Sequence, residues 1–91
     1  MEIKVYAIKD VKAGTFNQPF LQPTHGTAER SFQELVRDPQ SFVSKYPEDY
    51  DLYFLGSFDD LTGGIKSEKN PVHIINAAQL KNGEVTRPGL N

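Results

Sequence analysis

The chain has 91 residues, 37% of them hydrophobic, and its ten basic and twelve acidic residues give a formal charge of −2. This length predicts one small domain, and the absence of cysteine excludes disulfides, thiolate zinc sites and a cysteine nucleophile. Because a protein that binds phosphate backbones by charge alone is usually basic, a nucleic-acid surface here would have to be a local patch. No apolar run approaches the roughly 20 residues of a membrane span, and the opening MEIKVYAIKD does not have the pattern of a signal peptide.

The first part of the chain combines one clear strand with a long irregular segment. Apolar and polar residues alternate from Glu2 to Lys9, which is the pattern of a half-buried strand. Glycines and prolines then interrupt residues 10–26, which predicts a loop or an edge strand. Three large apolar side chains make this segment unusual for a solvated connection: Phe16, Phe20 and Leu21. We expect it to pack onto the domain or to dock a partner.

Two helices are predicted in the middle of the chain. The main helix covers residues 27–38, with Thr27 as its N-cap and Glu29 in its first turn. Its buried face is expected to hold the apolar residues at helical spacing, Ala28, Phe32, Leu35 and Val36. A short second helix is predicted between Asp38, as N-cap, and Pro47, which would end it. Its buried side is expected to consist of Phe42, Val43 and Tyr46.

Strands dominate the second half. Residues 50–60, YDLYFLGSFDD, have the aromatic and aliphatic content of a strand, and apolar groups on both faces indicate a central position. A turn, a weak return strand over residues 64–69, a last strand over 72–75 and a helical turn over 77–80 follow. The sequence therefore predicts an α+β domain over residues 1–80: a small, mostly antiparallel sheet of about four strands, with one main helix and a short second helix on one side. Residues 81–91 are expected to form a flexible tail.

Five acids crowd residues 48–60 and raise the question of a metal site. Calcium and magnesium prefer carboxylate oxygens, but no register here supplies the spacing of an EF-hand. Asp59 and Asp60 precede Thr62-Gly63-Gly64 and suit a turn. We predict no metal and no cofactor; a metal-dependent enzyme using Asp59 and Asp60 is a third hypothesis, behind the two given below.

Catalytic residues are hard to find. Only His25 and His73 could act as a general base near neutral pH. His73 lies in PVHII, a strand pattern in which a histidine is more often structural than catalytic. His25 has no acidic residue at a sequence spacing that would indicate a catalytic pair. No nucleophile elbow, P-loop, dinucleotide-binding or metalloprotease motif occurs. The sequence predicts that the protein is not an enzyme.

Nucleic-acid binding is indicated by aromatic and basic residues that interleave in the N-terminal third. Single-stranded DNA is typically held by aromatic side chains that stack on bases, beside Lys and Arg side chains that contact phosphates. The candidate patch comprises Lys4, Tyr6, Lys9, Lys12 and Phe16, with Arg30 and Arg37 as phosphate contacts. The alternative is that Tyr6 and Phe16 belong to the core and that Lys4 is a solvated strand residue.

Three stretches together resemble one family: VYAIKDVKAGTFNQPF, ERSFQELVRDPQSFVSKYPEDYDLYFLGSFDDLTG and PVHIINAAQL. From about Ile3 to Leu80 the chain is similar to the small nonstructural proteins of gokushovirus-type microviruses, tailless phages with circular single-stranded DNA genomes. The resemblance implies a bacterial host cytoplasm, a replicating single-stranded genome and a protein absent from the virion. Proteins of this family are described as DNA-binding, or as controlling the switch to single-stranded genome synthesis. The resemblance carries over no functional residue.

We therefore expect a non-enzymatic, nonstructural phage protein that binds single-stranded DNA or the phage replication proteins during genome synthesis. Ten cations are few for coating a genome, so a regulator with one local DNA-binding face fits the charge better. The alternative is a protein-interaction module, a homodimer or an adaptor without direct DNA contact. That module would use the apolar residues of the irregular segment, Phe16, Phe20 and Leu21.

Overall fold

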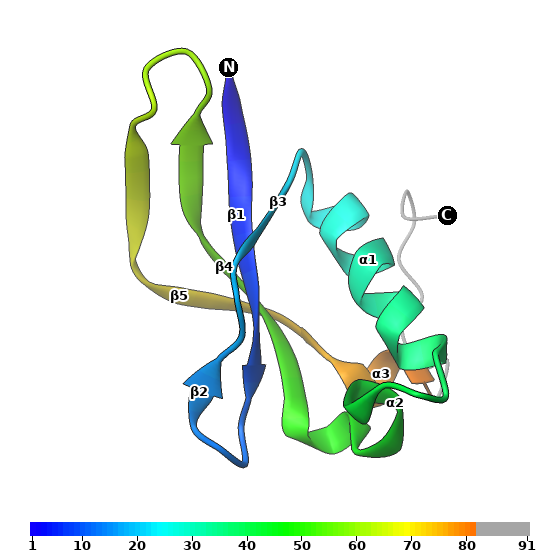
Figure 1. Ribbon diagram of the computed structural model, residues 1–91. Helices are drawn as coiled ribbons and strands as arrows, with labels where there is room; N and C mark the ends of the chain where they lie inside the picture. Colours follow the sequence, from blue (N-terminus) through cyan, green and yellow to red (C-terminus); the bar gives the residue numbers. More distant parts are fainter. Residues whose placement is uncertain (82–91) are drawn as a thin grey trace.

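The computed structural model describes residues 1–81, which form a five-stranded antiparallel sheet with helices on one side of it (Figure 1). The strands are β1 (Glu2–Asp10), β2 (Thr15–Phe16), β3 (Phe20–Gln22), β4 (Tyr50–Asp59) and β5 (Ile65–Asn76). The helices are α1 (His25–Arg37), α2 (Phe42–Lys45) and α3 (Ala77–Lys81), with a 3-10 turn η1 (Pro47–Asp49) before β4. The predicted α+β class and antiparallel sheet are confirmed. Of the predicted tail, Lys81 ends α3 and residues 82–91 lie outside the described part of the chain.

The sheet has one strand more than the sequence predicts, because the irregular segment supplies two strands while two predicted strands are joined as β5. The strand order is β2-β1-β4-β5, and β3 pairs with β1 next to β2. The β1–β2 turn closes at Gly14, whose φ of 75° favours glycine and whose N–H donates to the Asp10 carbonyl at 2.8 Å. β2 and β3 thus line the same edge of β1, which keeps the aromatic residues of this segment on the domain.

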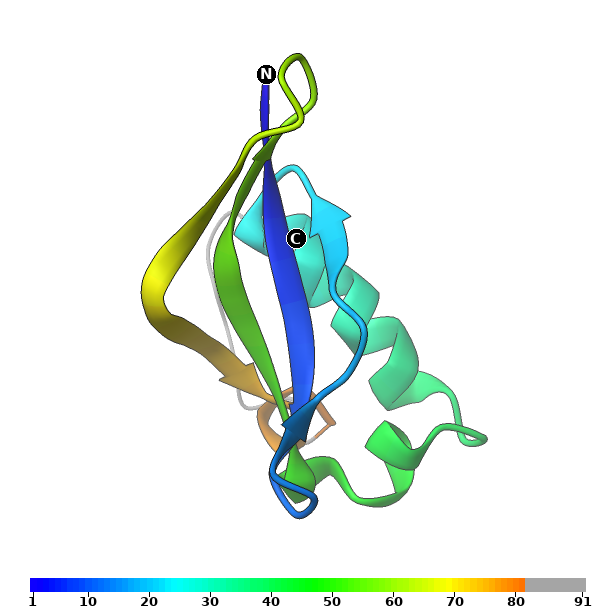
Figure 2. The ribbon, with the colours of Figure 1, turned by 60° about the vertical axis from the view of Figure 1, so that its left-hand side comes forward.

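β5 is a single strand with a sharp bend, where the sequence predicts two separate strands (Figure 2). Its pairing with β4 passes from Phe54↔Val72 to Gly56↔Ser67, so residues 68–71 bulge out opposite Leu55 alone. Gly56 makes this close approach possible. It has a φ of 153°, and a Cβ at this position would lie 2.0 Å from the Lys66 carbonyl oxygen.

α1 begins earlier than predicted, and its cap is Thr24 rather than Thr27. The Thr24 hydroxyl accepts from the Thr27 N–H at 3.1 Å, and the Thr27 hydroxyl accepts from the Thr24 N–H at 3.2 Å. The two threonines therefore form a capping box, in which each hydroxyl accepts from the backbone N–H of the other residue. Thr24 is the N-cap, and Thr27 is the third residue of the helix. As a result Glu29 lies beyond the first turn and is buried, with 4% of its surface exposed.

α2 also differs from its predicted form. Its N-cap is Ser41, whose hydroxyl accepts from the Ser44 N–H at 3.0 Å, whereas the predicted cap Asp38 forms a separate turn. This shift leaves one buried apolar residue in the helix, Val43. Phe42 and Tyr46, both predicted to be buried, are 66% and 56% exposed.

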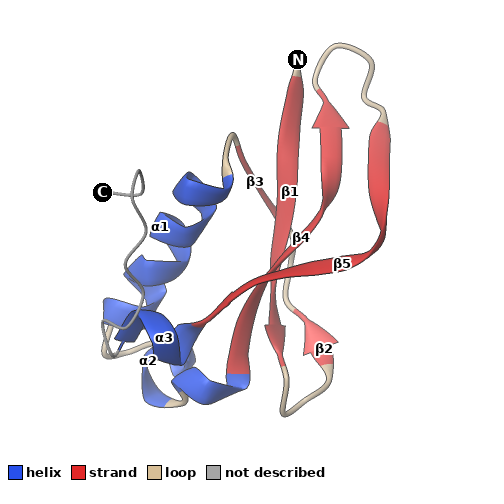
Figure 3. Cartoon of the chain, turned by 180° about the vertical axis from the view of Figure 1, so that it is seen from behind, coloured by secondary structure: helices blue, strands red, loops and turns tan. Residues whose placement is uncertain are grey.

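The hydrophobic core lies between α1 and one face of the sheet. Its largest fully buried side chains are Tyr6, Phe32, Leu52 and Ile75, from β1, α1, β4 and β5. Figure 3 shows the helices together on this side of the sheet. We call this side the covered face and the opposite side the uncovered face. None of the helices formed by residues 1–81 is both long and apolar enough to cross a membrane.

Candidate nucleic-acid interface

Tyr6 lies in the core and not on a DNA-binding surface. Its side chain is fully buried, stacked on Phe20 with ring centroids 5.9 Å apart. Burial raises the pKa of Tyr6 to about 12, so its hydroxyl keeps the proton, and it forms a hydrogen bond with Nδ1 of His25 at 2.5 Å. The prediction that Tyr6 stacks on a base is therefore wrong for this fold, because α1 covers its face of β1. The alternative interpretation of Tyr6 as a core residue is the correct one.

The predicted basic residues lie on different surfaces. Lys12 belongs to the β1–β2 turn at one end of the molecule, and Lys4 is half-buried in β1, paired with Gln22 and Ser57. Arg30 and Arg37 are exposed on α1, which packs on the covered face. Only Lys9 lies beside an aromatic member of the predicted patch, Phe16. The patch is thus not assembled as one site.

The three apolar residues of the irregular segment also separate. Phe20 pairs with Tyr6 and packs toward the core. Leu21 pairs with Val5 and is 46% exposed, and Phe16 pairs with Lys9 and is 41% exposed. Since paired residues of antiparallel strands share a face, Phe16 and Leu21 both belong to the uncovered face. Two of the three predicted interaction residues therefore remain accessible there.

Lys9 and Phe16 join a line of rings that crosses the uncovered face. The register pairs Lys9 with Phe16, and Tyr53 with both Ala7 and His73. The ring of Tyr53 lies 5.4 Å, centroid to centroid, from Phe16 on one side and from His73 on the other. Lys9 Nζ lies 5.4 Å from the Phe16 ring and 6.0 Å from the Tyr53 ring. We call these four residues, Lys9, Phe16, Tyr53 and His73, the ring row.

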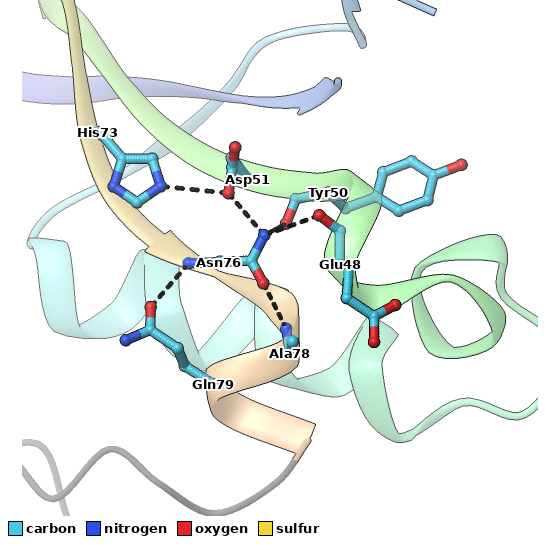
Figure 4. Close-up of polar contacts among 7 residues, drawn as sticks. All are labelled: Glu48, Tyr50, Asp51, His73, Asn76, Ala78 and Gln79. Carbon is cyan, nitrogen blue, oxygen red and sulfur yellow. Dashed lines mark hydrogen bonds and ion pairs between the residues drawn. The ribbon is translucent and has the colours of Figure 1, made fainter. Parts of the chain in front are cut away.

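His73 is held in its orientation by a polar network (Figure 4). Because an ionised carboxylate only accepts, His73 Nε2–H donates to Asp51 Oδ1, at 3.1 Å. The same oxygen accepts from Asn76 Nδ2 at 2.8 Å. His73 thus points one nitrogen at Asp51 and leaves Nδ1 for solvent or a ligand, and its side chain is 48% exposed.

Asn76 connects this end of the ring row to the rest of the fold. Its amide nitrogen also lies 3.1 Å from the Glu48 carbonyl oxygen and 3.2 Å from that of Tyr50. Its side-chain oxygen accepts from the Ala78 N–H at 2.9 Å, at the start of α3. One asparagine therefore ties together the end of β5, α3 and the beginning of β4 (Figure 4). This anchoring fixes Asp51, and through it His73, before any ligand binds.

The ring row offers three aromatic rings next to one ammonium group, on strands rather than on loops, and the Tyr53 ring makes an edge-to-face contact with each of its two neighbours. Such a surface can stack on unpaired bases, whose faces are apolar whatever their sequence, while the ammonium contacts a phosphate. The neighbouring Asp51 carboxylate is engaged by His73 and Asn76.

Sequence reasoning missed Tyr53 and His73. Part of the signal was present, since alternation already places Asp51 and Tyr53 on the same face of a strand. The pairing of Tyr53 with His73 depends on a register that shifts between Leu52 and Tyr53, where Ile74 is skipped. That irregularity has no signature in the sequence.

The acids of the β4–β5 turn have the role predicted for a turn. The Asp59 N–H donates to the Gly64 carbonyl at 2.8 Å, and Asp59 Oδ1 accepts from the Leu61 N–H at 2.9 Å. Within residues 1–81, no three or more His, Cys, Asp or Glu side chains come together as a metal-binding group. The hypothesis of a metal-dependent enzyme based on Asp59 and Asp60 thus gains no support from the geometry.

The family model described as "Phage ORF5 protein" matches residues 3–80. No curated protein and no solved structure matches the chain.

Proposed function

The chain belongs to the phage ORF5 protein family, and from this membership together with the ring row we propose that it binds single-stranded DNA through the uncovered face of its sheet. In this proposal it is a non-enzymatic, nonstructural protein of a gokushovirus-type microvirus. It acts in the cytoplasm of the bacterial host during genome synthesis, and it is absent from the virion.

The observation that carries the proposal is the spacing of the three rings. Phe16, Tyr53 and His73 come from three different strands, and neighbouring centroids are 5.4 Å apart. Each stacked base contributes about 1–3 kcal/mol to binding, with little dependence on sequence. Three rings in line can therefore hold a short piece of unpaired strand, whereas the stacked bases of a duplex leave no free face for them.

The net charge of the chain supports contact with DNA at one local site rather than a protein layer that covers the genome. Lys9 is the one cation of the ring row, and the whole chain carries −2. A protein that covers a genome neutralises many phosphates, and its affinity falls steeply with salt. We propose that this protein contacts few phosphates and acts as a regulator of the switch to single-stranded synthesis, alone or with a phage replication protein.

The test is fluorescence anisotropy of a labelled single-stranded oligonucleotide titrated with the full chain, with a duplex of the same sequence for comparison. We expect saturable binding to the single strand only. Tyr53→Ala should weaken it at least about tenfold, the loss of one stacked base. Tyr46→Ala, the same change at an exposed tyrosine that is not part of the ring row, should leave it unchanged. Absence of binding at low salt, or equal losses in the two variants, would refute the proposal.

A second candidate function is self-association through the same face. Leu21 is exposed there and pairs with the half-buried Val5 of β1, and Phe16 is exposed further along the same edge of β1, where it pairs with Lys9. Exposed apolar side chains of this kind can be covered by a partner, and a homodimer would cover them with a second copy. Sedimentation of the wild type and of Leu21→Glu distinguishes the two: a dimer that the substitution converts to a monomer, with no DNA binding by either, would favour this function.

A further inference from the structure

A groove lies at the end of the molecule where the β1–β2 turn meets α2 and η1. Its volume is about 450 Å³, and it is lined by Asp10, Lys12, Phe42, Tyr46, Asp49 and Tyr50. The Val11 N–H donates to the Asp49 carbonyl at 2.8 Å, which fixes the turn against η1. Figure 2 shows these segments at the same end of the molecule. The groove is therefore bounded by backbone that is held in place.

The aromatic side chains of the groove are exposed without an evident structural need. Phe42 and Tyr46 are four positions apart, at the start and at the C-cap of α2, and are 66% and 56% exposed. The core contact of α2 is made instead by Val43. Exposed aromatic rings in the lining of a cavity are typical of binding sites.

Two carboxylates, from Asp10 and Asp49, belong to the lining of the groove. The Tyr50 hydroxyl donates to Asp10 Oδ2 at 3.5 Å. Burial, followed by the carboxylates of Asp10 and Asp49, raises the pKa of Tyr50. Two carboxylates line the groove against one ammonium, that of Lys12. A neighbouring lysine already uses the aromatic surface, since Lys45 Nζ lies 5.7 Å from the centre of the Phe42 ring.

We propose that this groove binds an arginine side chain presented by a basic segment of another protein. A guanidinium group is planar, so it can stack on a ring such as Tyr46 while its N–H groups donate to the carboxylates of Asp10 and Asp49. The same carboxylates repel phosphate, so DNA is a poor occupant. The ring row and the groove would then serve two chemically different partners at separate places on one small domain.

The proposal is tested by titrating the uniformly ¹⁵N-labelled full chain with the blocked peptide Gly-Arg-Gly-Arg-Gly and following backbone amide shifts. The comparison peptide replaces each arginine by citrulline, which keeps the shape and removes the charge. We expect saturable shifts that are confined to residues 10–12 and 42–50, and none with the citrulline peptide. Equal binding of the two peptides, or shifts centred elsewhere, would overturn the proposal.

Matched variants locate the contacts. Asp49→Asn and Tyr46→Ala should each weaken binding of the arginine peptide at least about tenfold. Glu34→Gln, which removes an exposed acid from α1, should leave it unchanged. All three positions are outside the core, so circular dichroism should report wild-type folding. Wild-type affinity in both groove variants would contradict the proposal. Peptide-free dilution that moves the same amides would show a second copy in the groove, and would contradict it as well.

Discussion

The two faces of the sheet are built from neighbouring residues of the same strands, yet they have different roles. On β4, Leu52 is fully buried against α1, while the next residue, Tyr53, lies in the middle of the ring row. On β1, Ile8 is buried and Lys9 lies over two rings. The covered face is closed by a helix and serves stability. The uncovered face keeps rings and a cation accessible, at the cost of leaving apolar surface in water.

The largest expected effect breaks both faces at once. Gly56→Ala would place a Cβ 2.0 Å from the Lys66 carbonyl oxygen, at a φ that other residues rarely adopt. We expect a loss of more than about 3 kcal/mol in the free energy of unfolding, measured by urea denaturation. Gly14→Ala is the matched control: its φ is 75° but it has open space around it, so only about 1–2 kcal/mol should be lost. Similar losses at the two glycines would contradict the role given to this close approach.

A smaller loss should be confined to the covered face. Leu52→Ala removes a fully buried side chain and should lower the free energy of unfolding by about 2–5 kcal/mol. Under conditions where the variant remains folded, its affinity for single-stranded DNA should stay close to that of the wild type. Urea denaturation and the anisotropy titration measure the two quantities. If Leu52→Ala weakened DNA binding more than Tyr53→Ala does, the separation of roles between the faces would be wrong.

The buried tyrosine gives the covered face its own pH dependence. The folded-state pKa of Tyr6, about 12, is above the usual value near 10, so folding favours the protonated form. The stabilisation is complete below pH 10 and is lost as the pH rises from 10 to 12, by about 3 kcal/mol. Tyr6→Phe should unfold less steeply with pH in this window, although it also loses the hydrogen bond to His25. Parallel alkaline unfolding curves for the two proteins would contradict this assignment.

The smallest expected effect concerns the salt dependence of DNA binding at the uncovered face. If Lys9 contacts one phosphate, Lys9→Gln should reduce the slope of log affinity against log salt by about 0.7, the value for one contact on a single strand. Arg30→Gln, on α1, should not change the slope. The measurement is the anisotropy titration at several salt concentrations. A larger reduction with Arg30→Gln would place the DNA on the helix side of the molecule.

The sequence predicts the long strands well and the site poorly, for physical reasons. Alternation identifies β1 and β4, but it cannot tell which face of the sheet a helix will cover. That choice buries Tyr6 in the core and leaves Lys9 on the uncovered face. Thr24 and Thr27 are equally good caps by composition, and only the reciprocal hydrogen bonds decide between them. His73 meets Tyr53 because Ile74 is skipped in the register. Such irregular pairings depend on the whole sheet.

The bend in β5 also bears on how the protein behaves when it is concentrated. β5 is the outermost strand of the sheet, and its residues 65–73 are all exposed. Pro71 has no N–H to offer, and Lys66, Glu68 and Lys69 carry charge along the same segment. Straight, neutral edges recruit further strands and start aggregates, whereas bent and charged edges do not. The bulge opposite Leu55 would therefore keep the sheets of neighbouring copies from pairing edge to edge in a concentrated solution.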